Sequence, residues 1–117
     1  MAPNDYNQRE VIDLVEDLIT ATEKGDAQWE LLSEPEELFG LSTPGGIVTI
    51  HSAGHREHPF VLRLFDANER KLYEMATEVA PFYNSPEALL ERLFQAARNS
   101  VFDVGGTIRQ IRGSLGI

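Results

Sequence analysis

Three histidines lie within eight residues of the 117-residue chain, and they are its first candidates for chemistry: His51, His55 and His58. Neutral imidazole is the commonest metal ligand, and three such side chains could close most of a zinc site. The spacing as a whole is not a known metal-binding signature. Gly54 and Pro59 also disfavour a helix that would present two of the histidines on one face. A metal- or ligand-binding loop is therefore one hypothesis, and a polar loop between two strands is the other.

A second candidate site is a set of four acidic residues near the N-terminus: Glu10, Asp13, Glu16 and Asp17. They share the polar face of a predicted amphipathic helix. The acids can simply solvate an exposed helix face, or they can complement a protein partner that has a basic surface. An immunity protein, an antitoxin, an inhibitor or a subunit of a larger complex would fit the second interpretation. In that interpretation the chain is a non-enzymatic interaction module.

Charge is distributed unevenly along the chain, whose net charge is −9. Residues 1–37 hold eleven acids and two bases, residues 38–102 carry −1, and residues 103–117 carry +1. Binding to DNA or RNA is driven by Lys and Arg that release counterions from phosphates, so direct nucleic-acid binding is not expected. An anionic membrane surface is disfavoured for the same reason.

Residues for catalysis do not fall into a recognisable pattern. The chain has no cysteine, which excludes disulfides and thiolate chemistry. Ser52, Ser85 and Ser100 lie outside any Gly-x-Ser-x-Gly sequence. The glycine-rich segments 43–46 and 104–107 lack the order and the lysine of a phosphate-binding loop. We therefore assign no catalytic residue, expect no cofactor, and favour a protein that is not an enzyme.

Composition is that of an ordinary globular protein, with 42% hydrophobic and 25% charged residues. A chain of this length fits a single domain over residues 1–117. Apolar runs fall short of the ~18 residues that a membrane helix needs. The first residues lack the basic start and apolar core of a signal peptide, and the expected location is the cytoplasm.

The elements that must position these residues follow from hydrophobic periodicity. Apolar residues at helical spacing predict a helix over residues 11–24, which ends at Lys24 and Gly25. Alternating and β-branched segments predict strands at 28–32, 38–42, 47–51, 60–66 and 71–75. The connections between these strands are too short for parallel crossovers, so the pairing is expected to be antiparallel.

Two helices are predicted after the strands. Ser85 and Pro86 form a typical helix start, and an apolar stripe continues from Leu89 to Val101. A shorter helix follows Asp103, with three apolar residues in phase: Ile108, Ile111 and Leu115. That stripe could dock within the chain or on a second subunit, so a homodimer remains open.

The predicted fold class is α+β: an N-terminal amphipathic helix, an antiparallel sheet of three to five strands, a C-terminal helix and a short final helix. The two long helices are expected to cover the same face of the sheet. Segment 60–66 presents large apolar residues on both sides, Leu62 and Leu64 on one and Val61 and Phe65 on the other. The second face is therefore partly covered or forms a contact surface.

The order of these segments resembles small uncharacterised bacterial proteins. The resemblance rests on the acidic helix at 11–24, the Gly-Asp-x-x-Trp turn into a strand at 25–32, the Phe-x-Leu-Arg-Leu-Phe-Asp strand at 60–66, and the Leu-Leu-x-Arg-Leu-Phe-x-x-Ala-Arg helix at 89–98. It implies the order of the fold and no activity.

Overall fold

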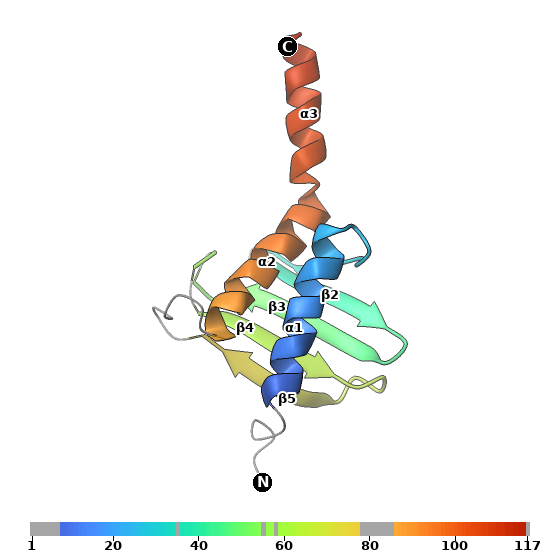
Figure 1. Ribbon diagram of the computed structural model, residues 1–117, viewed down its shortest axis with the longest axis vertical. Helices are drawn as coiled ribbons and strands as arrows, with labels where there is room; N and C mark the ends of the chain where they lie inside the picture. Colours follow the sequence, from blue (N-terminus) through green and yellow to red (C-terminus); the bar gives the residue numbers. More distant parts are fainter. Residues whose placement is uncertain (1–7, 35, 55, 58, 78–85, 117) are drawn as a thin grey trace.

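The computed structural model describes residues 8–34, 36–54, 56–57, 59–77 and 86–116. Within them the chain forms, in order, α1 (Gln8–Glu23), β1 (Glu30–Ser33), β2 (Leu38–Thr43), β3 (Gly46–Ser52), β4 (Phe60–Phe65), β5 (Lys71–Ala76), α2 (Pro86–Phe102) and α3 (Val104–Leu115). The five strands pair antiparallel in chain order, β1-β2-β3-β4-β5. Helices α1 and α2 lie side by side on one face of this sheet (Figure 1). The predicted α+β class and the order of its elements are confirmed.

Strand register follows from tight turns between β-branched segments. In the β2–β3 turn the Thr43 hydroxyl accepts hydrogen bonds from the backbone N–H groups of Gly45 and Gly46. Gly46 has a φ of 156°, and a Cβ there would collide with the carbonyl oxygen of Phe65 on β4. The turn therefore requires glycine at position 46.

The core lies between the sheet and the two long helices. Strand partners such as Phe39 and Ile50, or Ile50 and Leu62, point to the same face because their Cα atoms are paired across the strands. Helix α1 contributes Val11, Val15 and Ile19 to this core. Helix α2 contributes four residues: Leu90, Leu93, Phe94 and Ala97. The apolar stripes predicted from the sequence are thus the buried faces of both helices.

The C-terminal end of α1 is joined to the sheet by a buried hydrogen bond. The indole Nε1 of Trp29 donates to the Thr22 hydroxyl at 2.8 Å, and that hydroxyl donates to the Leu18 carbonyl at 2.6 Å. Gly25 has a φ of 83°, which ends the helix as predicted. This contact ties the end of α1 to the residue that precedes β1.

The other face of the sheet is covered by neither long helix (Figure 1). We call it the open face. By strand pairing and alternation its residues include Ile47, Thr49 and His51 on β3, Val61, Arg63 and Phe65 on β4, and Leu72 and Glu74 on β5. Thr49 and Val61 are buried by their neighbours, whereas Leu72 is exposed. The large apolar residues predicted on both sides of segment 60–66 therefore divide between the core face and the open face.

Helix α3 leaves the body at Asp103, which separates it from α2. Asp103 adopts a left-handed backbone conformation (φ 47°), and its carboxylate accepts a hydrogen bond from the Gly106 N–H as the N-cap of α3. None of the residues of α3 is buried. The radius of gyration is 15.3 Å, larger than the ~13.4 Å typical of a compact domain of this length, and α3 projects beyond the body (Figure 1).

Over the described residues, each helix is too short or too polar to span a bilayer.

Candidate functional site

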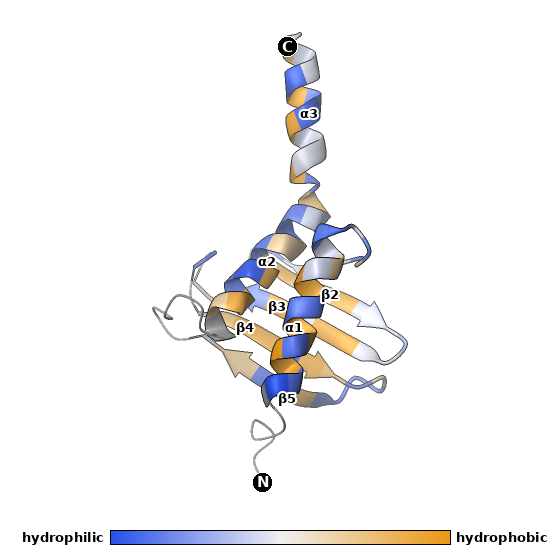
Figure 2. Ribbon diagram, viewed as in Figure 1, coloured by the Kyte–Doolittle hydropathy of each residue, from blue (hydrophilic) through white to orange (hydrophobic). Residues whose placement is uncertain are grey.

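The acidic residues that the sequence singled out lie together on the outer side of α1. Glu10, Asp13, Glu16 and Asp17 are all exposed, and they lie opposite the stripe that buries Val11, Val15 and Ile19. Figure 2 shows this division as blue and orange sides of the same helix. Arg9 Nε lies 3.3 Å from Asp13 Oδ1 in an exposed pair. Such pairs contribute little to stability, so the acids are presented to solvent.

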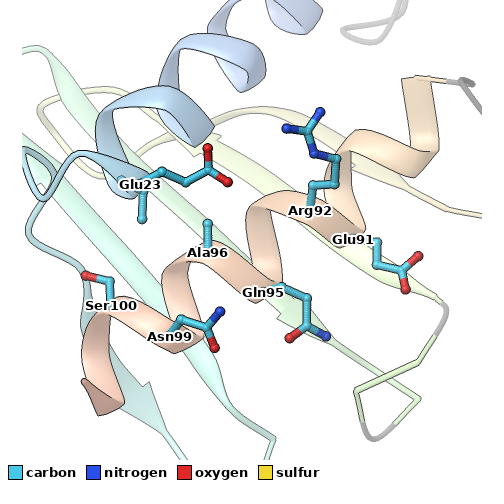
Figure 3. Close-up of a pocket in the computed structure, with 8 residues that line it drawn as sticks. Glu23, Glu91, Arg92, Gln95, Ala96, Asn99 and Ser100 are labelled. Atoms are coloured by element: carbon cyan, nitrogen blue, oxygen red, sulfur yellow. The ribbon is translucent and has the colours of Figure 1, made fainter. Parts of the chain in front are cut away.

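A pocket of about 530 Å³ lies between the C-terminal end of α1 and the outer side of α2. Thr22 and Glu23 come from α1, and the other six lining residues come from α2: Glu91, Arg92, Gln95, Ala96, Asn99 and Ser100 (Figure 3). No histidine is among these eight described residues. The pocket adds hydrogen-bonding groups to the surface of the helix layer.

His51 lies on the open face of the sheet, paired with Val61 on β4. Burial lowers the pKa of His51 below its ordinary value of 6.5, and the positive charge of Arg63 lowers it further, while Glu36 and Glu74 oppose the shift. Its Nδ1 atom is buried without a hydrogen-bond partner. Both observations favour the neutral form of the imidazole, and His51 is not part of a nucleophile–base pair among the described residues.

His55 and His58, the other two predicted metal ligands, lie outside the described residues. In the part of the chain that the structure describes, no group of three His, Asp or Glu side chains could hold a metal ion. The histidine metal site therefore stays a prediction.

The His51 pKa gives an expected pH dependence. The pKa of His51 is lower in the folded protein than in the unfolded chain, where it is about 6.5. The unfolded chain therefore binds more protons near this pH, and the free energy of unfolding falls as the pH drops through 6.5. Between pH 7.5 and 5.5, we expect the free energy of unfolding of the wild type to fall more steeply than that of His51→Gln. Urea titrations at fixed pH values measure both slopes, and equal slopes would contradict the assignment.

Arg63 and Glu74 form an ion pair next to His51 on the open face. Arg63 Nε donates to Glu74 Oε1 at 2.8 Å, and Lys71 Nζ lies 3.3 Å from the same oxygen. These hydrogen bonds lower the pKa of Glu74, and the bond from Arg63 has the larger effect. The carboxylate is thus fixed in its ionised form by two cations and is poorly suited to act as a general base.

A cluster that the sequence did not indicate joins three distant segments. Glu37, before β2, accepts hydrogen bonds from Arg56 Nε at 3.1 Å and from Arg98 Nε on α2 at 3.2 Å. Burial alone would raise the pKa of Glu37, but the hydrogen bonds from the two arginines outweigh it and the pKa is lowered. Arg98 also stacks over the ring of Phe102, 5.2 Å from its centroid. The cluster links α2, through Arg98, to the segments that carry Glu37 and Arg56.

Ser52 shapes the loop that carries Arg56. Its hydroxyl donates to the Glu57 carbonyl at 2.6 Å and accepts from the backbone N–H groups of Gly54 and Arg56. The side chain is buried at the end of β3. Ser52, considered above as a nucleophile, is therefore occupied in holding the loop.

Comparison of the chain with protein-family models, with curated protein sequences and with solved structures finds no significant match.

Proposed function

We propose that this protein is a non-enzymatic interaction module that binds a protein partner with a basic surface, in the manner of an immunity protein, an antitoxin, an inhibitor or a complex subunit. The partner-binding surface is the acidic face of α1: Glu10, Asp13, Glu16 and Asp17. The observation that carries the proposal is that all four side chains are exposed on one face of a helix whose other face is anchored in the core.

Electrostatics supports this choice of surface. Clustered charges of one sign accelerate association with an oppositely charged partner and reject partners of the same sign. Residues 1–37 carry as much net charge as the whole chain, −9. Since α1 is anchored in the core through Val11, Val15 and Ile19, the backbone that carries the acids is already ordered, and less conformational entropy is lost on binding than for an unfolded segment.

Charge reversal tests the proposal once a partner has been captured from a native lysate at moderate salt and identified. Replacing Glu10, Asp13, Glu16 and Asp17 by lysine is expected to weaken the purified complex about 100-fold, because four favourable charge contacts become repulsive. Isothermal titration calorimetry or surface plasmon resonance measures the dissociation constant, and raising the salt concentration should weaken the wild-type complex.

A matched control separates position from net charge. Glu30, Glu34, Glu57 and Glu69 are also exposed, and replacing these four by lysine changes the net charge by the same amount. This control should weaken binding by less than about 5-fold. If both variants bind equally well, or if the α1 variant keeps the wild-type affinity, the acidic face of α1 is not the binding surface.

A further inference from the structure

The pocket between α1 and α2 is lined by two buried residues, both of them small: Thr22 and Ala96. Arg92 and Ser100 lie four residues before and after Ala96, so the three side chains form one row along α2. Figure 3 shows this row together with Glu23, which extends from the end of α1 toward Arg92. Since Ala96 is the smallest residue of the row, it leaves a hollow between its neighbours, whose positions are ~12 Å apart along the helix axis.

Two opposite charges line this hollow without pairing. Glu23 comes from α1 and Arg92 from α2, and both side chains are exposed. Over the described residues, neither forms an ion pair or a side-chain hydrogen bond, with the other or with a third group. By contrast, Arg9, Arg63 and Arg70 on the same protein each pair with a carboxylate. The pocket therefore offers one carboxylate and one guanidinium that a ligand can pair with.

Three neutral polar side chains of the pocket also keep their hydrogen-bonding capacity. Gln95 and Asn99 present amides and Ser100 a hydroxyl, and none of the three has a side-chain partner in the described part of the chain. Ser100 differs in this respect from Thr20 and Ser114, whose hydroxyls donate to the carbonyl four residues earlier in their own helices. A ligand can therefore form hydrogen bonds here without breaking a bond of the fold.

Size and charge together define the class of ligand. The pocket volume of about 530 Å³ lies within the range of small-molecule sites, ~300–1,000 Å³. Glu91 lines the pocket as well, so two carboxylates and one guanidinium surround it, and a ligand with negative charge only is disfavoured. Arg92 in turn disfavours a ligand with positive charge only, and a neutral ligand would leave both charges unpaired. A molecule that carries one charge of each sign remains.

We propose that this pocket binds a small zwitterion of the amino-acid class, with an ammonium and a carboxylate a few bonds apart. The ammonium pairs with Glu23 and the carboxylate with Arg92, whose planar guanidinium suits a carboxylate. Gln95, Asn99 and Ser100 supply further hydrogen bonds. Because both protein charges are exposed, the dissociation constant is expected to be about 1 mM. The site goes beyond the proposed function, since it uses none of the four acids assigned to the partner-binding surface.

Titration of the isotope-labelled full chain with β-alanine, followed by amide NMR spectra, tests the proposal. Saturable shifts are expected for the amides of residues 22–23 and 91–100, with half-saturation at about 1 mM. Propylammonium and propionate each keep one of the two charges of β-alanine, and each should bind at least about 10-fold more weakly. Glycine and γ-aminobutyrate, titrated at the same salt concentration, then measure which separation of the two charges fits best.

Charge variants locate the site. Glu23→Gln and Arg92→Gln are each expected to weaken β-alanine binding about 10-fold. The double variant Glu23→Arg/Arg92→Glu restores one charge of each sign and should bind more tightly than either single variant. Glu30→Gln and Arg109→Gln are the matched controls, exposed and outside the pocket, and should change the affinity by less than about 2-fold. All four positions are exposed, so circular dichroism should show that every variant stays folded.

Three results would overturn the zwitterion site. The first is the absence of saturable shifts up to about 50 mM β-alanine. The second is equal binding of propylammonium or propionate, which indicates general charge attraction. The third is unchanged binding by both Glu23→Gln and Arg92→Gln. Because the titration uses no protein partner, its failure is separate from a failure of the acidic face of α1 to bind one.

Discussion

Replacing Phe94 by alanine is expected to lower the free energy of unfolding by about 3–5 kcal/mol. Phe94 is fully buried, and its ring lies 5.7 Å from that of Phe39 on β2 and 5.2 Å from that of Phe60 on β4. Truncation leaves a cavity where α2 meets two strands, and aromatic contacts are lost in addition to buried area. Thermal unfolding followed by circular dichroism should show a midpoint lower by more than about 10 °C.

Phe102→Ala provides the comparison for Phe94→Ala. Phe102 also contacts Phe39, at 6.0 Å and nearly edge-on, but it is 36% exposed at the end of α2. Its removal should cost about 1 kcal/mol, because less area is lost and no closed cavity forms. Equal losses for the two variants would show that Phe94 is not the centre of the core.

Removing the Glu37 carboxylate is expected to produce the second-largest loss of stability, about 2–3 kcal/mol for Glu37→Ala. The Glu37 side chain is only 13% exposed, and that of Arg98 is 23% exposed. Loss of the Glu37 carboxylate therefore leaves the partly buried guanidinium of Arg98 without this partner. Glu37→Gln keeps the shape of the side chain and should lose less. Urea unfolding at pH 7 measures both variants.

The pH dependence of the Glu37 effect has a defined sign. Because the folded-state pKa of Glu37 lies below its ordinary value of 4.5, the stabilisation is present above that pH and is lost as the pH falls through the folded pKa. The difference between wild type and Glu37→Gln should therefore narrow below about pH 4.5.

An exposed ion pair serves as the control for Glu37. Arg9 and Asp13 are separated by 3.3 Å, but Arg9 is 77% exposed. Breaking this pair with Arg9→Ala should change stability by less than about 0.5 kcal/mol. If Glu37→Ala has an effect as small as that of Arg9→Ala, the cluster contributes no more than a surface pair.

Local sequence determined most of the secondary structure. The five predicted strands are all present, although the first begins at Glu30 rather than residue 28. The predicted helix stop at Gly25 and the predicted short helix after Asp103 are also confirmed. Ser85, the predicted N-cap of α2, lies outside the described residues, but Pro86 is the first residue of that helix. These features depend on backbone preferences and periodicity, which neighbouring residues fix by themselves.

Contacts between distant segments could not be inferred in this way. Glu37 meets Arg56 and Arg98 across 19 and 61 residues of chain, and no spacing in the sequence marks such a contact. The sequence identified the acidic face of α1 because helical periodicity alone places Glu10, Asp13 and Glu16 opposite the apolar stripe. Their exposure was expected, and the structure agrees.

The sequence by itself thus determined the types of the elements, the buried stripes of α1 and α2, and the location of the net charge. Each of these depends only on residues that are close in the chain, within one or two helical turns or within one strand. Tertiary structure decided which sheet face the helices cover, where His51 lies, and that α3 leaves the body with its stripe uncovered. Those outcomes depend on strand pairing and on the backbone conformation of Asp103. A left-handed residue at that single position redirects a whole helix, which no hydrophobic pattern encodes.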